Sequence, residues 1–412
     1  MTAEAYELYV GVDWGTAMHV VCLLGPDGTR LEERRVPHTG DGLAALRAAL
    51  QARASDPARI AVAIEAPHGA VVDTLLDQGC HVYAINPKQL DRFRDRYSVA
   101  GAKDDRRDAF VAADALRTDR RAFRRLAPED PTVLQVREVS RLQGDLTAEH
   151  SRLTNQLREQ LWRYYIQLLA LCPAADEPWL WELLGQAPTP AEGRRLTASA
   201  LRALLARHRV RRLTGDDVHA ALQQPPLPVA AGTVAVAREH VALLIPRLHL
   251  LHEQRARCHQ RLKQLLDQVG RGAAPGEAVE HRDVTILRSL PGVGSLVAVT
   301  MLAEAWQPLA ARDYQTLRAH AGTAPVTRQS GKTRLVSMRR ACNRRLRTAV
   351  FHWARNAVRI DARSRAHYQQ LRQRHGYARA LRGVADRLLG LMITLLKHGT
   401  LYDPSRWQRH AA

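Results

Sequence analysis

Two short apolar segments near the N-terminus each end on an acidic residue, and this feature constrains the fold most. Tyr9–Asp13 (YVGVD) and Ile60–Glu65 (IAVAIE) have the length and composition of buried strands. Between them, Met18–Leu24 is another apolar run, and the Gly-Pro-Asp-Gly turn at 25–28 predicts a hairpin partner near 30–36. The chain is therefore expected to begin with a sheet whose strand ends carry carboxylates.

Helices and one more strand are predicted to alternate after this meander. The pattern predicts helices at about 41–53 and 69–78, a strand at His81–Ile85, and helices after Pro87 and over Asp105–Leu116. A three-strand meander followed by alternating helices and strands is the order expected of a ribonuclease-H-like α/β sheet. The first predicted domain covers residues 1–125.

A helical middle region is predicted over residues 126–275. From about Pro131 one long amphipathic helix is indicated, and a second runs from Val241 to Val269; the two can pair as an antiparallel coiled coil. Several prolines between 173 and 235 indicate an inserted small helical module. The first helix is predicted from apolar residues spaced mostly by three, four or seven: Leu142, Leu146, Leu153, Leu157, Leu161, Tyr164 and Leu168.

The last predicted domain, residues 276–412, is mostly helical and strongly basic. The whole chain has 61 Lys and Arg against 41 Asp and Glu, a net charge of +20. Most of this excess falls between Arg328 and the C-terminus, where Arg dominates. Arg presents a planar, permanently charged fork that suits phosphate, so nucleic acid is the predicted partner. A GC-rich genome also enriches Arg, but it does not explain the excess of positive over negative charge.

Other classes of protein are disfavoured. The N-terminus lacks the basic and apolar regions of a secretory signal, and no apolar run approaches the length of about 20 residues that a membrane span needs. The 5 cysteines are scattered without a CxxC pair, which indicates neither a disulfide framework nor a zinc site. We therefore expect a bacterial cytoplasmic protein, associated with the nucleoid when bound to DNA.

Four acidic residues are candidate metal ligands. Asp13 and Glu65 stand at strand ends, whereas Asp105 and Asp108 share one helix face with Cβ atoms about 5–6 Å apart. Such an anionic cluster is costly unless cations neutralise it, and Mg²⁺ or Mn²⁺ takes oxygen ligands. Taken singly, Asp105 and Asp108 also suit a helix N-terminus, and Asp13 suits a turn. The ordered set favours a metal site that acts on a phosphodiester.

The N-terminal motifs resemble a known family. YVGVDWG at 9–15, AVAIEAPHG at 61–69, AINPK at 84–88 and KDDRRDA at 103–109 are similar to the RuvC-like catalytic domain of the DEDD insertion-sequence transposases. These enzymes are understood as bridge-RNA-guided serine recombinases. The resemblance implies that the DEDD residues are Asp13, Glu65, Asp105 and Asp108. Asp104 occupies the usual Thr or Ser place and is a further candidate ligand.

A serine lies in a cationic segment of the last domain. Ser330 precedes Gly331 and is surrounded by Arg328, Lys332 and Arg334, in a stretch whose Ser, Gly and Thr content predicts a loop. A hydroxyl in a cationic loop can attack phosphate while the cations stabilise the transition-state charge. From this loop alone, a serine that only hydrogen-bonds the backbone is the favoured interpretation.

Four C-terminal motifs resemble the transposase domain of the same family in order and spacing. They are Pro-Gly-x-Gly at 291–294, Ala-Gly-x-x-Pro at 321–325, Gln-Ser-Gly at 329–331 and Asn-x-x-Leu-Arg at 343–347. The resemblance implies that Ser330 is the nucleophile; the usual Gly before the Asn is Cys342 here. Backbone N–H groups of the first motif can hold a phosphate, although a plain helix–helix turn fits nearly as well.

The favoured function is a DNA transposase that cleaves and exchanges strands through a serine–DNA intermediate, with Mg²⁺ or Mn²⁺ at the acidic site. The resemblance implies donor and target DNA, an element-encoded bridge RNA, and a tetramer built from dimers. Two alternatives stay open: a metal-only nuclease such as a Holliday-junction resolvase, and a non-catalytic nucleic-acid-binding regulator. Neither alternative requires both motif sets in one chain. The predicted nucleic-acid contacts are Arg328, Lys332, Arg334, Arg339, Arg340, Arg344, Arg345 and Arg347.

Overall fold

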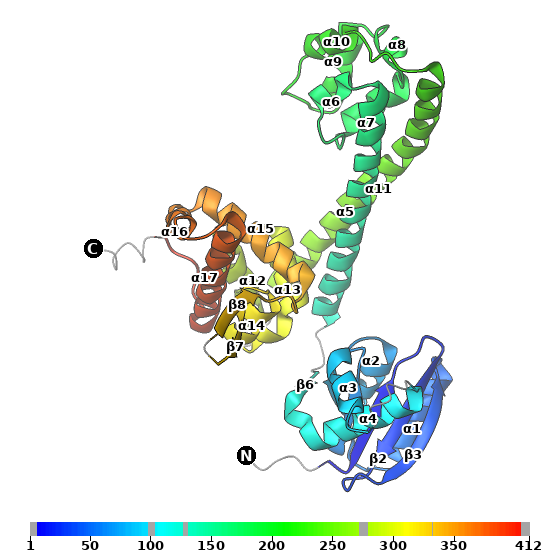
Figure 1. Cartoon of the computed structure of the whole chain (residues 1–412), viewed down its shortest axis with the longest axis vertical. Coiled ribbons are helices and arrows are strands. Elements are labelled where there is room, and N and C mark those ends of the chain that lie inside the picture. Colours follow the sequence, from blue (N-terminus) through cyan, green and yellow to red (C-terminus); the bar gives the residue numbers. More distant parts are fainter. Residues whose placement is uncertain (1–5, 98–103, 127–130, 272–278, 332, 405–412) are drawn as a thin grey trace, which may run out of the picture. The chain divides into compact units, whose positions relative to one another are not determined.

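The computed structural model describes residues 6–97, 104–126, 131–271, 279–331 and 333–404 (Figure 1). The chain divides into two compact units, Met1–Asp130 and Pro131–Ala412. Lys332 and the start of the Lys103–Ala109 motif lie outside the described residues. No helix among the described residues is long and apolar enough to cross a membrane.

The N-terminal unit is built on a six-stranded mixed sheet, with strand order β3-β2-β1-β4-β5-β6. The first three strands form an antiparallel meander, and β4 and β5 continue from β1 in parallel. The predicted α/β class and the meander are therefore confirmed. The strands are β1 (Leu8–Asp13), β2 (Met18–Leu24), β3 (Arg30–Pro37), β4 (Ile60–Ile64), β5 (His81–Ala84) and the short β6 (Arg124–Arg125).

Helices cover both faces of this sheet. On one face α1 and α2 pack on the larger strand residues, among them Val10 and Val62. On the other face α4 packs closely, because the strand residues there are small: Gly11, Ala61 and Ala63. The helices are α1 (Gly40–Gln51), α2 (Ala70–Asp77), α3 (Pro87–Arg94) and α4 (Asp105–Asp119), with short 3-10 turns η1 (Pro57–Arg59) and η2 (Arg120–Ala122).

Two long helices run antiparallel through the second unit (Figure 1): α5 (Pro131–Tyr164) and α11 (Ala231–Arg271). Near one end Cys258 Sγ lies 3.4 Å from the Val139 carbonyl oxygen, to which it donates, and near the other end Leu153 and Val241 share one core. The predicted first helix is too long at its C-terminal end, since the chain turns after Tyr164. Leu168 belongs to the next helix.

Five short helices join α5 to α11 and form a small module at one end of the pair (Figure 1). Its core is aromatic and aliphatic: Trp179 and Trp181 are 1% and 0% exposed, and Tyr164 and Tyr165 are completely buried. The helices are α6 (Gln167–Leu171), α7 (Pro178–Gln186), α8 (Pro190–Gly193), α9 (Ala198–Arg207) and α10 (Gly215–Gln223).

The other end of the pair carries a helical body with its own core around Trp353. Its helices are α12 (Val279–Ser289), α13 (Ser295–Ala310), α14 (Tyr314–His320), α15 (Arg344–Ile360), α16 (Ala362–Arg372) and α17 (Tyr377–His398). The Pro-Gly-x-Gly turn joins α12 to α13. A Cβ on Gly292 would lie 2.7 Å from the Ala357 backbone nitrogen, so this glycine allows the turn to pack on α15.

The loop predicted around Ser330 is wrong, because this segment is an antiparallel hairpin. Its strands are β7 (Pro325–Ser330) and β8 (Thr333–Met338), and Ser330 pairs with Thr333 across the turn. Gly331 has φ of 54°, which is the left-handed conformation that a tight two-residue turn favours. Both strands are largely exposed. Strands without a buried face lack the apolar alternation by which strands are predicted.

Candidate active site

Asp13 and Glu65 come together at one edge of the N-terminal sheet. Asp13 is the last residue of β1, and Glu65 directly follows β4. The two strands are parallel neighbours, with Val12 paired to Ile64, so the next residue of each strand emerges at the same edge. Asp13 is half-buried and Glu65 is exposed. The sheet thus juxtaposes two carboxylates at the ends of buried strands.

Helix α4 brings the other two acids to the same region by crossing β1 at very short range. A Cβ on Gly11 would lie 1.9 Å from the Ala109 carbonyl oxygen and 2.6 Å from the Ala113 nitrogen. Only a glycine allows this approach. Asp105 and Asp108 occupy the first turn of α4. Asp108 directly precedes Ala109, the residue that lies against Gly11.

Asp104 has a local structural role that the sequence did not distinguish. It is the N-cap of α4, and its side chain accepts a hydrogen bond from the Arg106 backbone nitrogen at 3.4 Å. Capping residues commonly carry an acidic or hydroxyl side chain for this purpose. Asp104 therefore serves as the helix cap of α4 in this structure.

Asp108 is held by a cation that sequence reasoning missed. Its side chain is only 2% exposed, and Arg94 at the end of α3 donates from Nε to its Oδ1 at 2.7 Å. Arg94 also reaches Asp91 at 2.9 Å. Asp105, in contrast, is exposed to solvent. A buried carboxylate needs a counter-charge, and Arg94 supplies it in this structure.

The donor set fits a hard divalent cation, because all four side chains offer carboxylate oxygens. Their oxygens are nevertheless not gathered to coordinating distance. Among the described residues, the one group of three candidate ligands with atoms within 4.8 Å of one another is Cys172, Asp176 and Glu177, in the module. In this structure Asp108 is engaged by Arg94 instead.

The closeness of Cys172, Asp176 and Glu177 in the module is explained by structural hydrogen bonds. Glu177 accepts hydrogen bonds from the Trp179 indole at 2.7 Å, from Arg212 and from the Cys172 thiol at 3.5 Å. Burial, together with the nearby Glu177 carboxylate, raises the pKa of Cys172. A protonated thiol and an already occupied carboxylate are poor metal ligands.

Two histidines support the backbone that follows Asp13, and no sequence pattern indicates them. His19 of β2 is completely buried, and its Nδ1 accepts from the Gly15 backbone nitrogen at 3.3 Å. Its Nε2 lies 2.9 Å from Nδ1 of His38. Burial and the neighbouring His38 lower the pKa of His19. A neutral His19 thus fixes the turn beside the acidic edge.

Ser330 lies exposed at the tip of the β7–β8 hairpin. Side chains of directly paired residues share a face, so Ser330 and Thr333 lie together, with Arg328 two residues along the same face. Arg334 pairs with Gln329 and belongs to the opposite face. The serine therefore has one cation on its own side of the hairpin among the described residues, where the sequence suggested several.

The basic residues after the hairpin divide into two groups. Arg340 and Arg344 are exposed, and Arg339 is half-buried. Arg345, however, donates to the Arg141 carbonyl oxygen at 3.0 Å and to Asp145 at 2.9 Å. Arg347 donates to the carbonyl oxygens of Arg339 and Arg340 at 3.2 and 3.1 Å. Arg347 is half-buried and braces the backbone after the hairpin, whereas Arg345 is exposed and its pair with Asp145 lies at the surface.

Asn343 links the hairpin region to the long helices. It is the N-cap of α15, and its Nδ2 donates to Glu304 at 2.6 Å. Glu304 also accepts from Arg141 of α5 at 3.2 Å. Burial alone would raise the pKa of Glu304, but the hydrogen bonds from Arg141 and Asn343 outweigh it and lower the pKa. The Asn of the C-terminal motif thus has a structural partner.

Comparison with known families identifies the class of protein as a transposase. Residues 10–166 match a DEDD-type family model described as "Transposase", and residues 284–369 match one described as "Transposase IS116/IS110/IS902 family". The first match covers the acidic edge and α4, and the second covers the hairpin with Ser330.

Relatives along the whole chain give the family. The "Mini-circle putative transposase for IS117" of Streptomyces coelicolor is 31% identical, and the alignment covers 98% of both chains. The "Putative transposase y4uE" of Sinorhizobium fredii is 52% identical over 50% of this chain and 57% of its own length. A 43.6 kDa protein of IS110 from S. coelicolor is 28% identical over 97% of this chain and 96% of its own.

The chain belongs to the DEDD-type IS110/IS116/IS902 family of insertion-sequence transposases, which confirms the resemblance found in the sequence. Membership implies DNA substrates, DNA strand cleavage and a divalent metal ion at the DEDD site.

Proposed function

We propose that this transposase exchanges DNA strands through a covalent link between DNA and Ser330, assisted by Mg²⁺ held by Asp13, Glu65, Asp105 and Asp108 in a RuvC-like unit. One observation carries the proposal: a single chain combines an acidic sheet edge overlaid by α4 with an exposed serine at a hairpin tip. A hydrolytic nuclease needs only the first of these features.

The serine chemistry is balanced without an external energy source. The Ser330 oxygen attacks phosphorus, the bond from phosphorus to one sugar oxygen breaks, and that oxygen leaves as a free hydroxyl. Arg328, on the same hairpin face, is in position to offset charge on the non-bridging oxygens. Attack by a hydroxyl of another strand then releases Ser330. The phosphoserine ester conserves the phosphodiester bond energy between the two steps.

The acidic edge would hold the metal once Asp108 is free. Bound there, a divalent ion would supply Lewis-acid stabilisation of the phosphodiester under attack. Asp13 and Glu65 are presented by rigid buried strands, and α4 is fixed by its contact with Gly11. In this structure Arg94 neutralises Asp108, so Asp108 would join the other three acids as a ligand only after parting from this guanidinium.

The basic surface supports a role in binding both DNA and an element-encoded bridge RNA. Exposed Arg340 and Arg344 and the exposed hairpin offer phosphate contacts. Arg345 is also exposed but pairs with Asp145, and Arg347 donates to backbone carbonyl oxygens. Replacing Arg340 and Arg344 by Gln should lower the salt dependence of DNA binding by roughly 0.9 in logarithmic slope per lost contact. An unchanged slope would assign this helix end to another role.

The proposed assembly is a tetramer of two dimers, and an apolar stripe on α11 supports pairing of two copies within it. Val236, Leu243 and Leu250 are spaced by seven residues and are 66%, 71% and 54% exposed. Spacing by seven keeps side chains on one helix face, as in helices that pair with a partner helix. Exposed aliphatic residues at this spacing suit contact with the same helix of a second copy.

The decisive experiment replaces Ser330 by Ala and traps the adduct on a nicked DNA substrate with Mg²⁺. We expect DNA binding to persist, because Arg328 and its neighbours remain, and the covalent adduct and recombinant product to disappear. Thr333→Ala is the matched control, since Thr333 pairs with Ser330 beside the same turn. It should retain the adduct.

The outcomes separate the competing functions. Metal-dependent cleavage without any adduct in the parent protein would support a hydrolytic nuclease. No cleavage under any condition would support a non-catalytic regulator. Loss of cleavage in Asp13→Asn and Glu65→Gln, with retention in the exposed control Asp41→Asn, is expected if the acidic edge holds the metal.

A further inference from the structure

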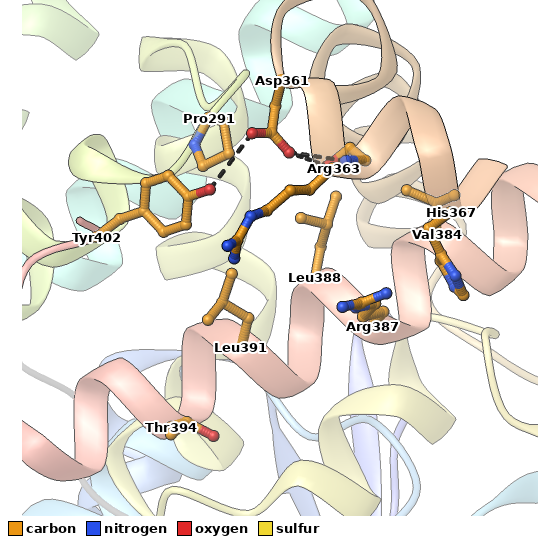
Figure 2. A pocket seen from close by; sticks show the side chains of 11 residues that line it. Pro291, Asp361, Arg363, His367, Val384, Arg387, Leu388, Leu391, Thr394 and Tyr402 are labelled. Atoms are coloured by element: carbon orange, nitrogen blue, oxygen red, sulfur yellow. Dashed lines mark hydrogen bonds between the residues drawn. The ribbon is translucent and has the colours of Figure 1, made fainter. Parts of the chain in front are cut away.

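A cavity of about 190 Å³ lies between α16, α17 and the segment that follows α17 (Figure 2). Leu388 and Leu391 of α17 and Pro291 of the α12–α13 turn give it apolar walls. It lies outside the acidic edge, which belongs to the other unit. It also lies outside the β7–β8 hairpin, whose residues do not line it.

An aromatic side chain is fixed in the wall of this cavity. Tyr402 donates from its backbone nitrogen to Ser289 Oγ at 2.9 Å and from its hydroxyl to Asp361 Oδ1 at 3.4 Å. The segment 399–404 therefore passes beside the end of α12 and the start of α16. Gly399, with φ of 61°, ends α17 in the left-handed conformation that allows this turn. The ring is held before any ligand arrives.

The charged groups around the cavity favour an anion at its mouth. Arg363 and Arg387 extend along two sides of it (Figure 2). The single acid in the lining, Asp361, is already occupied: Ser364 donates to its Oδ2 from the backbone at 2.8 Å and from the hydroxyl at 2.7 Å. Burial, together with Arg387, lowers the pKa of His367. The His367 imidazole therefore adds little charge near neutrality.

We propose that this cavity receives one unpaired nucleotide of a DNA strand, with the base against Tyr402 and the leucines and the phosphate on Arg363 and Arg387. Bases stack on aromatic rings and guanidinium planes, and a flanking cation tracks the phosphate. Strand exchange leaves stretches of unpaired bases, so this inference rests on the proposed function of the C-terminal unit as a DNA-binding body.

The test is photocrosslinking of the full chain to a single-stranded oligonucleotide that carries 5-iododeoxyuridine. We expect the crosslink on Tyr402, the sole aromatic residue of the tryptic peptide that follows Lys397. Leu391→Trp should fill the cavity and lower the yield of the Tyr402 crosslink at least about tenfold. The affinity for the strand in a gel shift should change by less than about twofold. Tyr402→Phe, which keeps the ring, should retain the crosslink.

Charge and competition controls complete the test. Arg387→Gln should lower the crosslink yield several-fold, whereas Lys397→Gln, on the same helix but outside the lining, should not. Free thymidine monophosphate that abolishes the crosslink at concentrations below that of the oligonucleotide would show a site for mononucleotides and overturn the assignment to a strand. Strand binding with the crosslink elsewhere, or unaffected by Leu391→Trp, would overturn the cavity proposal alone. Absence of any strand binding would overturn both proposals.

Discussion

Arg94→Met should destabilise the N-terminal unit and make its stability depend on divalent metal. The Arg94 and Asp108 side chains are 14% and 2% exposed, with Nε and Oδ1 2.7 Å apart. Removing one partner of a buried ion pair costs about 3–5 kcal/mol, because the remaining charge is left uncompensated. We expect the free energy of unfolding to fall by about 3 kcal/mol, the low end of this range, because solvent can reach the Arg94 side of the pair. For a unit of this size that is roughly 10 °C in Tm.

Two changes should reverse this loss. Arg94→Met combined with Asp108→Asn removes both charges and should recover most of the stability, since the penalty comes from the unpaired carboxylate. Mg²⁺ or Mn²⁺ should also recover it in the single variant by taking the place of the guanidinium. At a concentration 100 times its Kd, an ion bound only to the folded state contributes about 2.7 kcal/mol.

Calorimetry of the full chain, with hydrogen exchange of the α4 amides to report on the N-terminal unit, measures these effects. Arg96→Met is the control, because it breaks the Arg96–Asp119 pair, in which both side chains are 49% exposed. Exposed pairs contribute about 0–1 kcal/mol, so this variant should be nearly neutral and insensitive to metal. An Arg94→Met variant that is destabilised but recovered by neither ion would refute the assignment of Asp108 as a ligand.

Three further changes test other parts of the structure. Gly11→Ala should cost about 1–3 kcal/mol in urea denaturation because its Cβ would meet the α4 backbone, whereas Gly40→Ala, with open space around its Cβ, should not destabilise. The lowered pKa of Glu304 means that its carboxylate stabilises the fold above about pH 4.5 and less as pH falls through the depressed value, so Glu304→Gln should flatten this acid limb of the stability profile. Leu243→Glu should reduce the assembly mass in light scattering without lowering Tm, because Leu243 is 71% exposed; an unchanged mass would exclude the α11 stripe as an interface.

The N-terminal sheet was predictable because its strands are buried and its turns are marked. Gly-Pro-Asp-Gly separates β2 from β3, and the apolar runs of β1 and β4 match the observed strands to within one residue at most ends. The position of Asp13 beside Glu65 followed from the same pattern. Sequence periodicity reports burial, and here burial and strand structure coincide.

The features that the sequence did not predict are tertiary contacts or exposed elements. The pairing of Arg94 with Asp108 joins α3 to α4, and nothing in the spacing of these residues indicates it. The β7–β8 hairpin has no buried face, so its residues show no apolar alternation. Arg347 reads as a surface cation in the sequence, but it is half-buried and donates to two backbone carbonyl oxygens.

Pro246 lies inside α11 without ending it, although proline usually interrupts a helix. Pro246 and Ala242, the residue one turn earlier whose carbonyl loses its partner, are both exposed. Water can therefore satisfy the free carbonyl. A sequence pattern alone does not show on which side of the helix this defect falls.

The antiparallel pair of α5 and α11 sets the reach of the module that it carries. At 1.5 Å per residue, the 34 residues of α5 extend about 50 Å. A lengthening of one helix alone would break the shared core, so changes in length must occur in both helices together. They must also come in steps of seven residues, or about 10 Å, for the buried faces to stay in register. The distance between the module and the helical body at the other end of the pair can therefore change only in discrete steps during evolution.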